Sequence, residues 1–193
     1  MPKHTRRLFI CAVASVDLVE YAMKNVSEQL RLRDDFAAKL LEGIQHVPPE
    51  KRIIVDTGGG ALVSFLDDPE DALYMVLHLH EAMLSAYTGE GLQGAMRSCI
   101  NLGPVVLSED LNGRPLTVGD GVNAARQIMR CADPGEVLVS RPYYELIARL
   151  SPDHAALFGD AGLRTDEESR EHEVYVVRDC ESALQFVTRR MRG

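Results

Sequence analysis

The stretch "RIIVDTGGGALVSF", Arg52–Phe65, places two short apolar runs on either side of three consecutive glycines. A glycine-rich turn between two such runs is typical of a β-hairpin, so the stretch predicts two antiparallel strands. Glycine occurs where a backbone needs a positive φ or must come close to another group. We therefore expect the tip at Gly58, Gly59 and Gly60 to approach something closely; a tight turn with no ligand is the alternative.

The composition is that of a globular chain. Its 193 residues are 46% hydrophobic and 26% charged, which suffices for a buried core. This length predicts one domain over residues 1–193. The formal net charge of −8 argues against general nucleic-acid binding, which needs a basic surface. A local site can still be positive, so the net charge does not exclude a nucleotide ligand.

Cysteine usage and the longest apolar run predict the compartment. Cys11, Cys99, Cys131 and Cys180 form no CxxC pair, so we expect reduced, mostly buried thiols rather than a disulfide framework or a zinc site. The apolar run Leu8–Val16 is too short to span a bilayer. The preceding "MPKHTRR" lacks a secretory cleavage pattern. We expect a cytoplasmic protein that binds no membrane.

Periodicity and turn residues predict the order strand, helix, hairpin, helix, strand, helix, strand, helix, strand. Besides the hairpin, the expected strands are Leu8–Val16, Met96–Leu107, Val137–Ser140 and Val174–Val177, and the expected helices follow Ser27 and Asp68 or cover Gly119–Ala132 and Tyr143–Leu150. This order fits an α+β fold with a ferredoxin-like βαββαβ core and helices on one face of the sheet. A doubly wound sheet is the alternative, which the glycine hairpin disfavours. We expect the core over residues 8–178 and a C-terminal tail over 179–193, with the mixed-charge run "RTDEESREHE" as a solvated loop.

Two segments carry side chains suited to a phosphorylated ligand. Asp17 stands where the first strand ends and a helix follows, a position that suits a metal-bound phosphate; the alternative is that it caps the helix. The segment "GDGVNAAR" offers the amide of Asn123 and the guanidinium of Arg126, which can hold a sugar and a phosphate. A capped helix with a surface arginine is the alternative. The segment is neither a Walker A loop nor a full dinucleotide fingerprint.

Taken in order, these segments resemble the class III nucleotidyl cyclase catalytic domain, the adenylate and guanylate cyclase family. The stretches that carry the resemblance are "LFICAVASVDLVEYA", "DTGGGALVSFLDDPEDAL", "MRSCINLGPV", "GDGVNAARQIMRCADPGEVLVS" and "REHEVYVV". Several motifs in order are far more specific than any one of them. The resemblance implies the βαββαβ core and a head-to-tail dimer with active sites at its interface. It also implies a two-metal mechanism, in which Mg²⁺ or Mn²⁺ acts on a nucleoside triphosphate.

The first motif supplies the metal and phosphate positions that this resemblance implies. Asp17 matches the first metal aspartate, and Leu18 would add its backbone carbonyl. The turn made by Leu18, Val19, Glu20 and Tyr21 would face the phosphates. The family has glycine where this chain has Glu20. A carboxylate there opposes a triphosphate, and its side chain can obstruct the turn amides.

Other positions depart from the family pattern. The second metal aspartate is expected at position 59, where the chain has Gly59, and Asp56 lies an odd three residues earlier, so its side chain is expected on the opposite face of the sheet. Asn123 matches the ribose-orienting asparagine. The charge-stabilising arginine is expected at Gln127, and Arg126, one residue earlier on a helix, points about 100° away.

The remaining family positions are uninformative or acidic. The phosphate-binding lysine is expected near Asp166 or Glu167, and the base-selecting residues near Val55 and Leu116, so no purine preference is predicted. Together the departures favour a catalytically degenerate cyclase-homology domain that acts in cyclic-nucleotide signalling as a dimerising or nucleotide-binding module. One alternative is the weaker half of a heterodimer with another cyclase domain. Another is an active cyclase that converts a nucleoside triphosphate to the 3′,5′-cyclic monophosphate and pyrophosphate.

Overall fold

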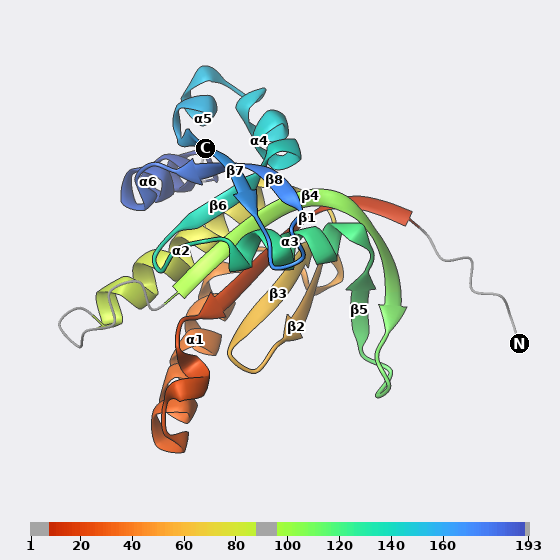
Figure 1. The fold of residues 1–193 in the computed structure, drawn as a ribbon, viewed down its shortest axis with the longest axis vertical. Coiled ribbons are helices and arrows are strands. Elements are labelled where there is room, and N and C mark those ends of the chain that lie inside the picture. Colours follow the sequence, from red (N-terminus) through yellow and green to blue (C-terminus); the bar gives the residue numbers. More distant parts are fainter. Residues whose placement is uncertain (1–7, 88–95, 192–193) are drawn as a thin grey trace, which may run out of the picture.

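The structure is a computed structural model that describes residues 8–87 and 96–191 (Figure 1). In this part of the chain, one eight-stranded sheet runs in the order β2-β3-β1-β4-β6-β8-β7, with β5 paired to β4. The strands are β1 (Leu8–Leu18), β2 (Arg52–Asp56), β3 (Gly60–Phe65), β4 (Met96–Glu109), β5 (Pro115–Val118), β6 (Val137–Ser140), β7 (Phe158–Thr165) and β8 (Glu171–Val177). The helices are α1 (Val26–Gly43), α2 (Glu70–Tyr87), α3 (Asp120–Arg130), α4 (Arg141–Ala148), α5 (Pro152–Ala156) and α6 (Cys180–Met191), with short 3₁₀ turns η1 (Tyr21–Met23) and η2 (Pro49–Lys51).

The first half of the sheet is the ferredoxin-like core that the sequence predicts. Strand β1 pairs antiparallel with β3 on one side and with β4 on the other, and β3 pairs antiparallel with β2. Helix α1 connects β1 to β2, and α2 connects β3 to β4, which completes the βαββαβ order. Strand β6 then joins β4 in parallel, and β8 and β7 extend the sheet.

Helices cover both faces of this sheet, so the expectation of helices on one face is wrong. Successive residues of a strand point to opposite faces. Val16 of β1 belongs to the main core with α1 and α2, whereas Val13 packs with Val122 and Ala125 of α3. Figure 1 shows α3 crossing the sheet. Asp17 has the same parity as Val13, so its side chain lies on the α3 face.

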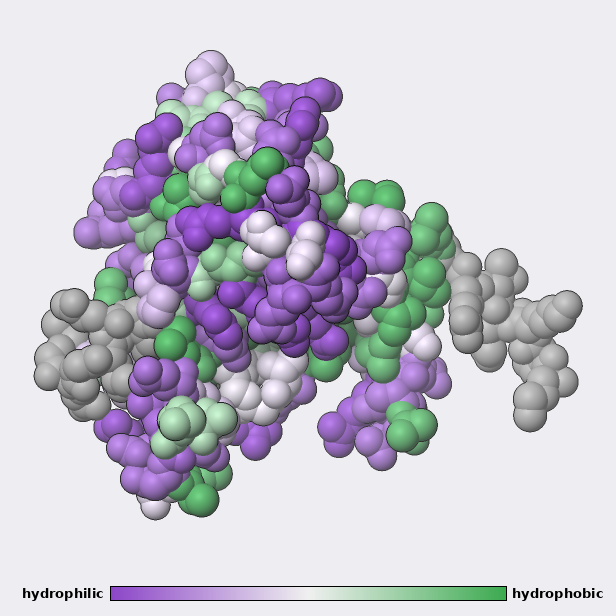
Figure 2. All heavy atoms as spheres, viewed as in Figure 1, coloured by the Kyte–Doolittle hydropathy of each residue, from purple (hydrophilic) through white to green (hydrophobic). Residues whose placement is uncertain are grey.

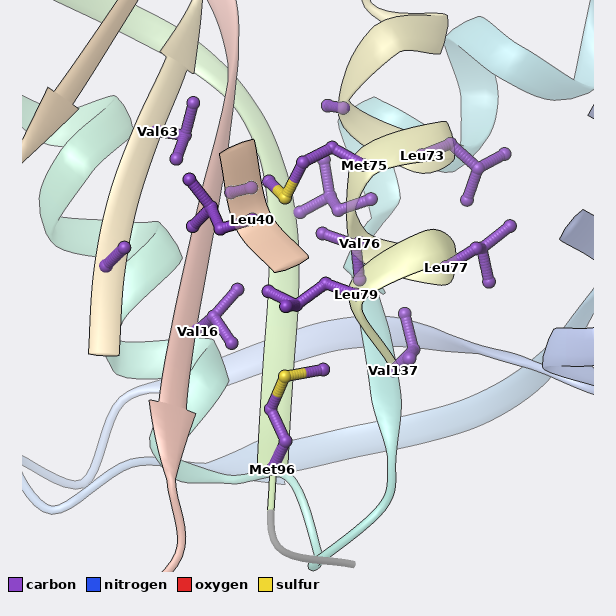
Figure 3. Packing of buried hydrophobic residues seen from close by; sticks show 14 of the residues in the cluster. Val16, Leu40, Val63, Leu73, Met75, Val76, Leu77, Leu79, Met96 and Val137 are labelled. Atoms are coloured by element: carbon purple, nitrogen blue, oxygen red, sulfur yellow. The ribbon is translucent and has the colours of Figure 1, made fainter. Parts of the chain in front are cut away.

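The main core lies between the sheet and α2. Figure 3 shows Met75 and Leu79 of α2 pointing toward the strands, where Val16 of β1 and Val63 of β3 lie. All four side chains are essentially inaccessible to solvent. Burying an apolar side chain of this size contributes about 1.5–3 kcal/mol. This packing fixes the positions of β1 and β3, whose ends carry the candidate site.

Four elements of the second half, β5, β7, α5 and α6, are missing from the sequence-based prediction. Strand β7 contains two glycines, and its buried and exposed residues do not alternate regularly, so it lacks the pattern that indicates a strand. The run "RTDEESREHE", expected to be a solvated loop, in fact contributes the end of β7 and the start of β8. Helix α6 places Ala183 and Val187 in the main core, so the packed structure extends past residue 178 into the expected tail.

Helix α1 has its N-cap two residues earlier than expected. Asn25, rather than Ser27, is the N-cap: its side chain accepts a hydrogen bond from the Glu28 backbone at 3.0 Å, and the Glu28 carboxylate accepts one from the Asn25 backbone at 3.1 Å. This reciprocal capping box satisfies two otherwise unpaired amides. Across the two described stretches of chain, none of the helices is both long enough and apolar enough to cross a membrane.

Candidate nucleotide site at the end of β1

The glycine-rich β2–β3 turn approaches the end of β1, and two of its glycines have a clear structural reason to be glycine. Gly60 pairs with Asp17, and a Cβ at Gly60 would lie 2.0 Å from the carbonyl oxygen of Val16, far inside any allowed contact. Gly58 has a φ of +88°, which favours glycine. Gly59 accepts a hydrogen bond from the Leu18 backbone at 2.8 Å. The tip therefore approaches the backbone of β1 itself.

The Gly59 position faces an aromatic ring. A Cβ built there would lie 2.9 Å from Cδ1 and 3.2 Å from Cγ of Tyr21, the first residue of η1. An aspartate at position 59 therefore requires the ring to move. The space where the family resemblance expects the second metal carboxylate is occupied by Tyr21.

Asp17 is already paired with a cation. Its Oδ2 atom accepts hydrogen bonds from Nη2 of Arg97 at 3.0 Å and from Nε at 3.3 Å. The two residues are direct partners across the β1–β4 ladder, and both side chains are about one-third exposed. Arg97 is absent from the residues predicted from sequence, because the contact depends on the β1–β4 register, which no local pattern reveals.

The turn after Asp17 carries backbone strain. Glu20 has a φ of 57° in the left-handed region, which costs roughly 1–2 kcal/mol for a residue with a Cβ. Within the described chain its side chain is exposed and has no hydrogen-bond partner. Val19 is half-buried and Leu18 is buried. A glycine, which the family has at position 20, would adopt this conformation without strain.

Asp56 does not replace the missing carboxylate. It accepts hydrogen bonds from the Gly58 backbone at 2.7 Å and from Nη2 of Arg33 at 2.5 Å. The Gly58 amide, and then the Arg33 guanidinium, hold the pKa of Asp56 below its usual value. Arg33 belongs to α1, so Asp56 points to the α1 face, opposite to Asp17, as the odd offset predicts.

The α3 residues of the predicted site lie apart from Asp17. Asn123 and Arg126 are exposed, and within the described residues no hydrogen bond or ion pair engages their side chains. Their neighbours Val122 and Ala125 pack on the middle of β1 near Val13. Asp17 is four residues further along the strand, which is about 13 Å. The structure thus leaves Asn123 and Arg126 directed outward rather than toward Asp17 of the same chain.

The expected position of the phosphate lysine is a structural turn. Asp166 closes the β7–β8 turn, where its carboxylate accepts hydrogen bonds from the backbones of Glu168 and Arg170, from Arg170 Nε and from His172 Nε2, all at 2.9–3.0 Å. The hydrogen bond from His172 is the main reason that the pKa of Asp166 lies far below its usual range. No residue of this turn offers the free cation that the resemblance implies.

These side chains do not fit a pair of divalent ions. Asp17 is paired with Arg97, Gly59 supplies no side-chain ligand, and Asp56 is held on the other face. Over residues 8–87 and 96–191, no group of three or more histidine, cysteine, aspartate and glutamate side chains is placed to hold a metal ion. One carboxylate remains where two-metal chemistry needs a shared set of charged ligands.

Comparison with solved structures identifies the fold. The adenylyl cyclase CyaB from P. aeruginosa is 18% identical, with a TM-score of 0.71 over 90% of this chain and 95% of that one. An adenylate/guanylate cyclase/hydrolase from Silicibacter pomeroyi is 24% identical, with a TM-score of 0.69 over 91% and 100%. The guanylate cyclase domain of RhGC from Catenaria anguillulae, in complex with GTP, is 19% identical, with a TM-score of 0.68 over 89% and 97%.

The chain therefore has the fold of the class III adenylyl and guanylyl cyclase catalytic domains. No protein-family profile and no curated protein sequence matches it. The likeness thus lies in the arrangement of strands and helices over nearly the whole chain. What the site can do has to be argued from its own residues.

Proposed function

We propose that this chain is a catalytically degenerate cyclase-fold module of cyclic-nucleotide signalling, which acts by dimerising and by binding a nucleotide rather than by cyclising it. The observation that carries the proposal is the contact between Tyr21 and the Gly59 position. The contact supports a site in which Tyr21 has filled the space of the second aspartate. It does not support a site that would bind metal ions once a single side chain was restored.

The expected cost to catalysis is large. A metal-bridging carboxylate and a charge-stabilising arginine act in the transition state, and removing one such group typically costs roughly 3–4 kcal/mol. This chain lacks both groups, because it has Gly59 in place of the carboxylate and Gln127 in place of the arginine. If the two losses add, the rate falls by about four orders of magnitude or more. Glu20 adds a negative charge beside the place where phosphates would lie.

A dimer is supported by the distribution of the remaining site residues. Asp17 lies near the end of β1, whereas Asn123 and Arg126 face outward from α3, which packs on the middle of that strand, so a composite site needs a second copy. Figure 2 shows apolar side chains gathered over the start of β1 and over the paired strands β4 and β5. Leu8 and Ile10 are each 63% exposed there, and exposed apolar patches of this kind mark interaction surfaces.

A second candidate is the weaker half of a heterodimer. Asn123 is exposed on α3 and retains the residue type of the ribose-orienting position. A partner cyclase domain that supplies both aspartates could use it. In that case the isolated chain is silent, and a mixture with an active partner gains activity that depends on Asn123.

Light scattering and calorimetry test this proposal. We expect the purified chain to elute as a dimer in size-exclusion chromatography with light scattering, and to bind GTP or ATP in isothermal titration calorimetry without releasing cyclic product. A chain that remains a strict monomer at all concentrations, with and without nucleotide, would contradict the proposal, because it leaves no composite site.

A further inference from the structure

Helix α1 and the edge strand β2 leave a cavity of about 150 Å³ between them. It lies on the α1 face of the sheet, opposite to Asp17. Its apolar walls are formed by the side chains of Leu18, Phe36, Leu40, Ile54 and Ala61. A cavity of about this volume with such a lining can hold one benzene-sized molecule. The space therefore fits a single isobutyl or benzyl group.

The cavity also carries one charge of each sign. Arg33 of α1 and Asp56 of β2 line it and form an ion pair whose side chains are 51% and 54% exposed. Exposed ion pairs of this kind are worth about 1 kcal/mol or less, so a ligand can rearrange the pair at little cost.

Both members of this ion pair have hydrogen-bonding capacity to spare. The Arg33 guanidinium has five N–H donors. Within the described residues, only the donor that binds the Asp56 carboxylate is engaged. Arg141 of the same chain binds Glu145 at 2.7 Å and Glu173 at 2.8 Å, which shows one guanidinium serving two carboxylates. The Asp56 carboxylate likewise has acceptor sites beyond those used by Arg33 and Gly58.

We propose that this cavity binds a free α-amino acid with an apolar side chain of the size of leucine or phenylalanine. The ligand carboxylate binds the unused N–H donors of Arg33, the ligand ammonium binds Asp56, and the side chain fills the apolar space. A zwitterion presents one charge of each sign, which matches the pair of Arg33 and Asp56 at the cavity. It also adds no net charge to a chain of net charge −8. A simple carboxylic acid leaves Asp56 without a new partner, and a simple amine does the same to Arg33.

The position of this cavity gives the ligand access to the β2–β3 turn. Asp56 accepts a hydrogen bond from the Gly58 backbone at 2.7 Å, and Gly58 and Gly60 form part of the cavity wall. The bound amino acid therefore contacts the same turn that packs on the end of β1. The proposal stands apart from the proposed nucleotide function, because it rests on the opposite face of the sheet.

Isothermal titration calorimetry of the full chain tests the ligand class. The probes are L-leucine, L-phenylalanine, 4-methylpentanoate, which lacks the ammonium group, and 3-methylbutylamine, which lacks the carboxylate. We expect one site per chain, and at least tenfold tighter binding of an amino acid than of either truncated probe. Absence of saturable binding for both amino acids, or equally tight binding of 4-methylpentanoate, would overturn the proposal.

Variants locate the site. Arg33→Gln and Asp56→Asn should each weaken amino-acid binding at least tenfold; asparagine keeps an oxygen that can accept the Gly58 hydrogen bond. Ala37→Leu, which narrows the cavity from α1, should abolish binding. Lys51→Gln is the matched control, since it breaks an exposed ion pair with Asp67 outside the cavity and should leave the affinity unchanged. Binding that survives both Arg33→Gln and Ala37→Leu in variants that circular dichroism shows to be folded would overturn the assignment.

Discussion

The ring of Tyr21 lies over the backbone of Gly59, so that a Cβ at position 59 would be 2.9 Å from the ring. This contact links the turn after β1 to the β2–β3 turn, at the position where the family resemblance leads us to expect the second metal carboxylate. It predicts that the site resists repair by restoring one residue.

Gly59→Asp is therefore expected to destabilise the protein by about 1–3 kcal/mol, because the new side chain overpacks the ring. Tyr21→Ala makes room, so the double variant should be more stable than the sum of the two single effects predicts, by at least about 0.5 kcal/mol. Urea unfolding of the wild type, both single variants and the double variant measures this coupling. Additive effects would show that the ring does not obstruct position 59.

Glu20→Gly is expected to stabilise the protein by about 0.5–1 kcal/mol. It removes the left-handed strain of a residue with a Cβ, and the greater freedom of glycine in the unfolded chain offsets part of this gain. Glu20→Ala is the matched control, because it removes the carboxylate but keeps the Cβ. Thermal unfolding compares the two. An equal gain from alanine would assign the effect to the charge instead of the backbone.

Gly60→Ala tests how closely the β2–β3 turn approaches β1. The added methyl group would collide with the Val16 carbonyl oxygen, which backbone pairing on both sides holds in place. We expect a loss of about 3 kcal/mol or more in the free energy of unfolding. Gly58→Asn is the control in the same turn: nothing lies within 4 Å of its Cβ position, and asparagine tolerates positive φ. It should cost less than about 1 kcal/mol.

The strands and helices of the first half could be predicted because each carries a local signal. The apolar run of β1, the glycine turn before β3 and the proline after Asp68 need no knowledge of the rest of the chain. Strand β7 could not be predicted, because its buried and exposed residues do not alternate regularly and the strand is defined by its pairing with β8. The presence of helices on both faces of the sheet could not be predicted either, because no local pattern shows which face α3 covers.

The candidate site shows the same division. Asp17, Glu20, Gly59 and Gln127 could be picked out from their positions in the family pattern. The contacts of Arg97 with Asp17 and of Tyr21 with the Gly59 position could not, because both join segments that only the strand register brings together. Each contact is therefore visible only once the neighbouring segments are placed in space.

The Asp166 turn predicts a pH dependence of stability. Its folded-state pKa is depressed, chiefly by the hydrogen bond from His172. The resulting stability is fully present above the unfolded-state pKa of about 3.9 and is lost as the pH falls from there through the folded-state value. Asp166→Asn should therefore be less stable than the wild type at pH 7, and the difference should shrink below about pH 4. Chemical unfolding at several pH values measures it; a difference that stays constant with pH would contradict the role of the carboxylate.

The chain has the cyclase fold, and we propose that it lacks cyclase turnover. The most direct measurement is chromatographic detection of cyclic nucleotide and pyrophosphate after incubation of the purified chain with ATP or GTP and Mn²⁺, beside an Asp17→Asn variant that exposes any contaminating cyclase. We expect the wild type to form no product above the Asp17→Asn level. Turnover by the wild type that Asp17→Asn abolishes would contradict the proposed loss of catalysis.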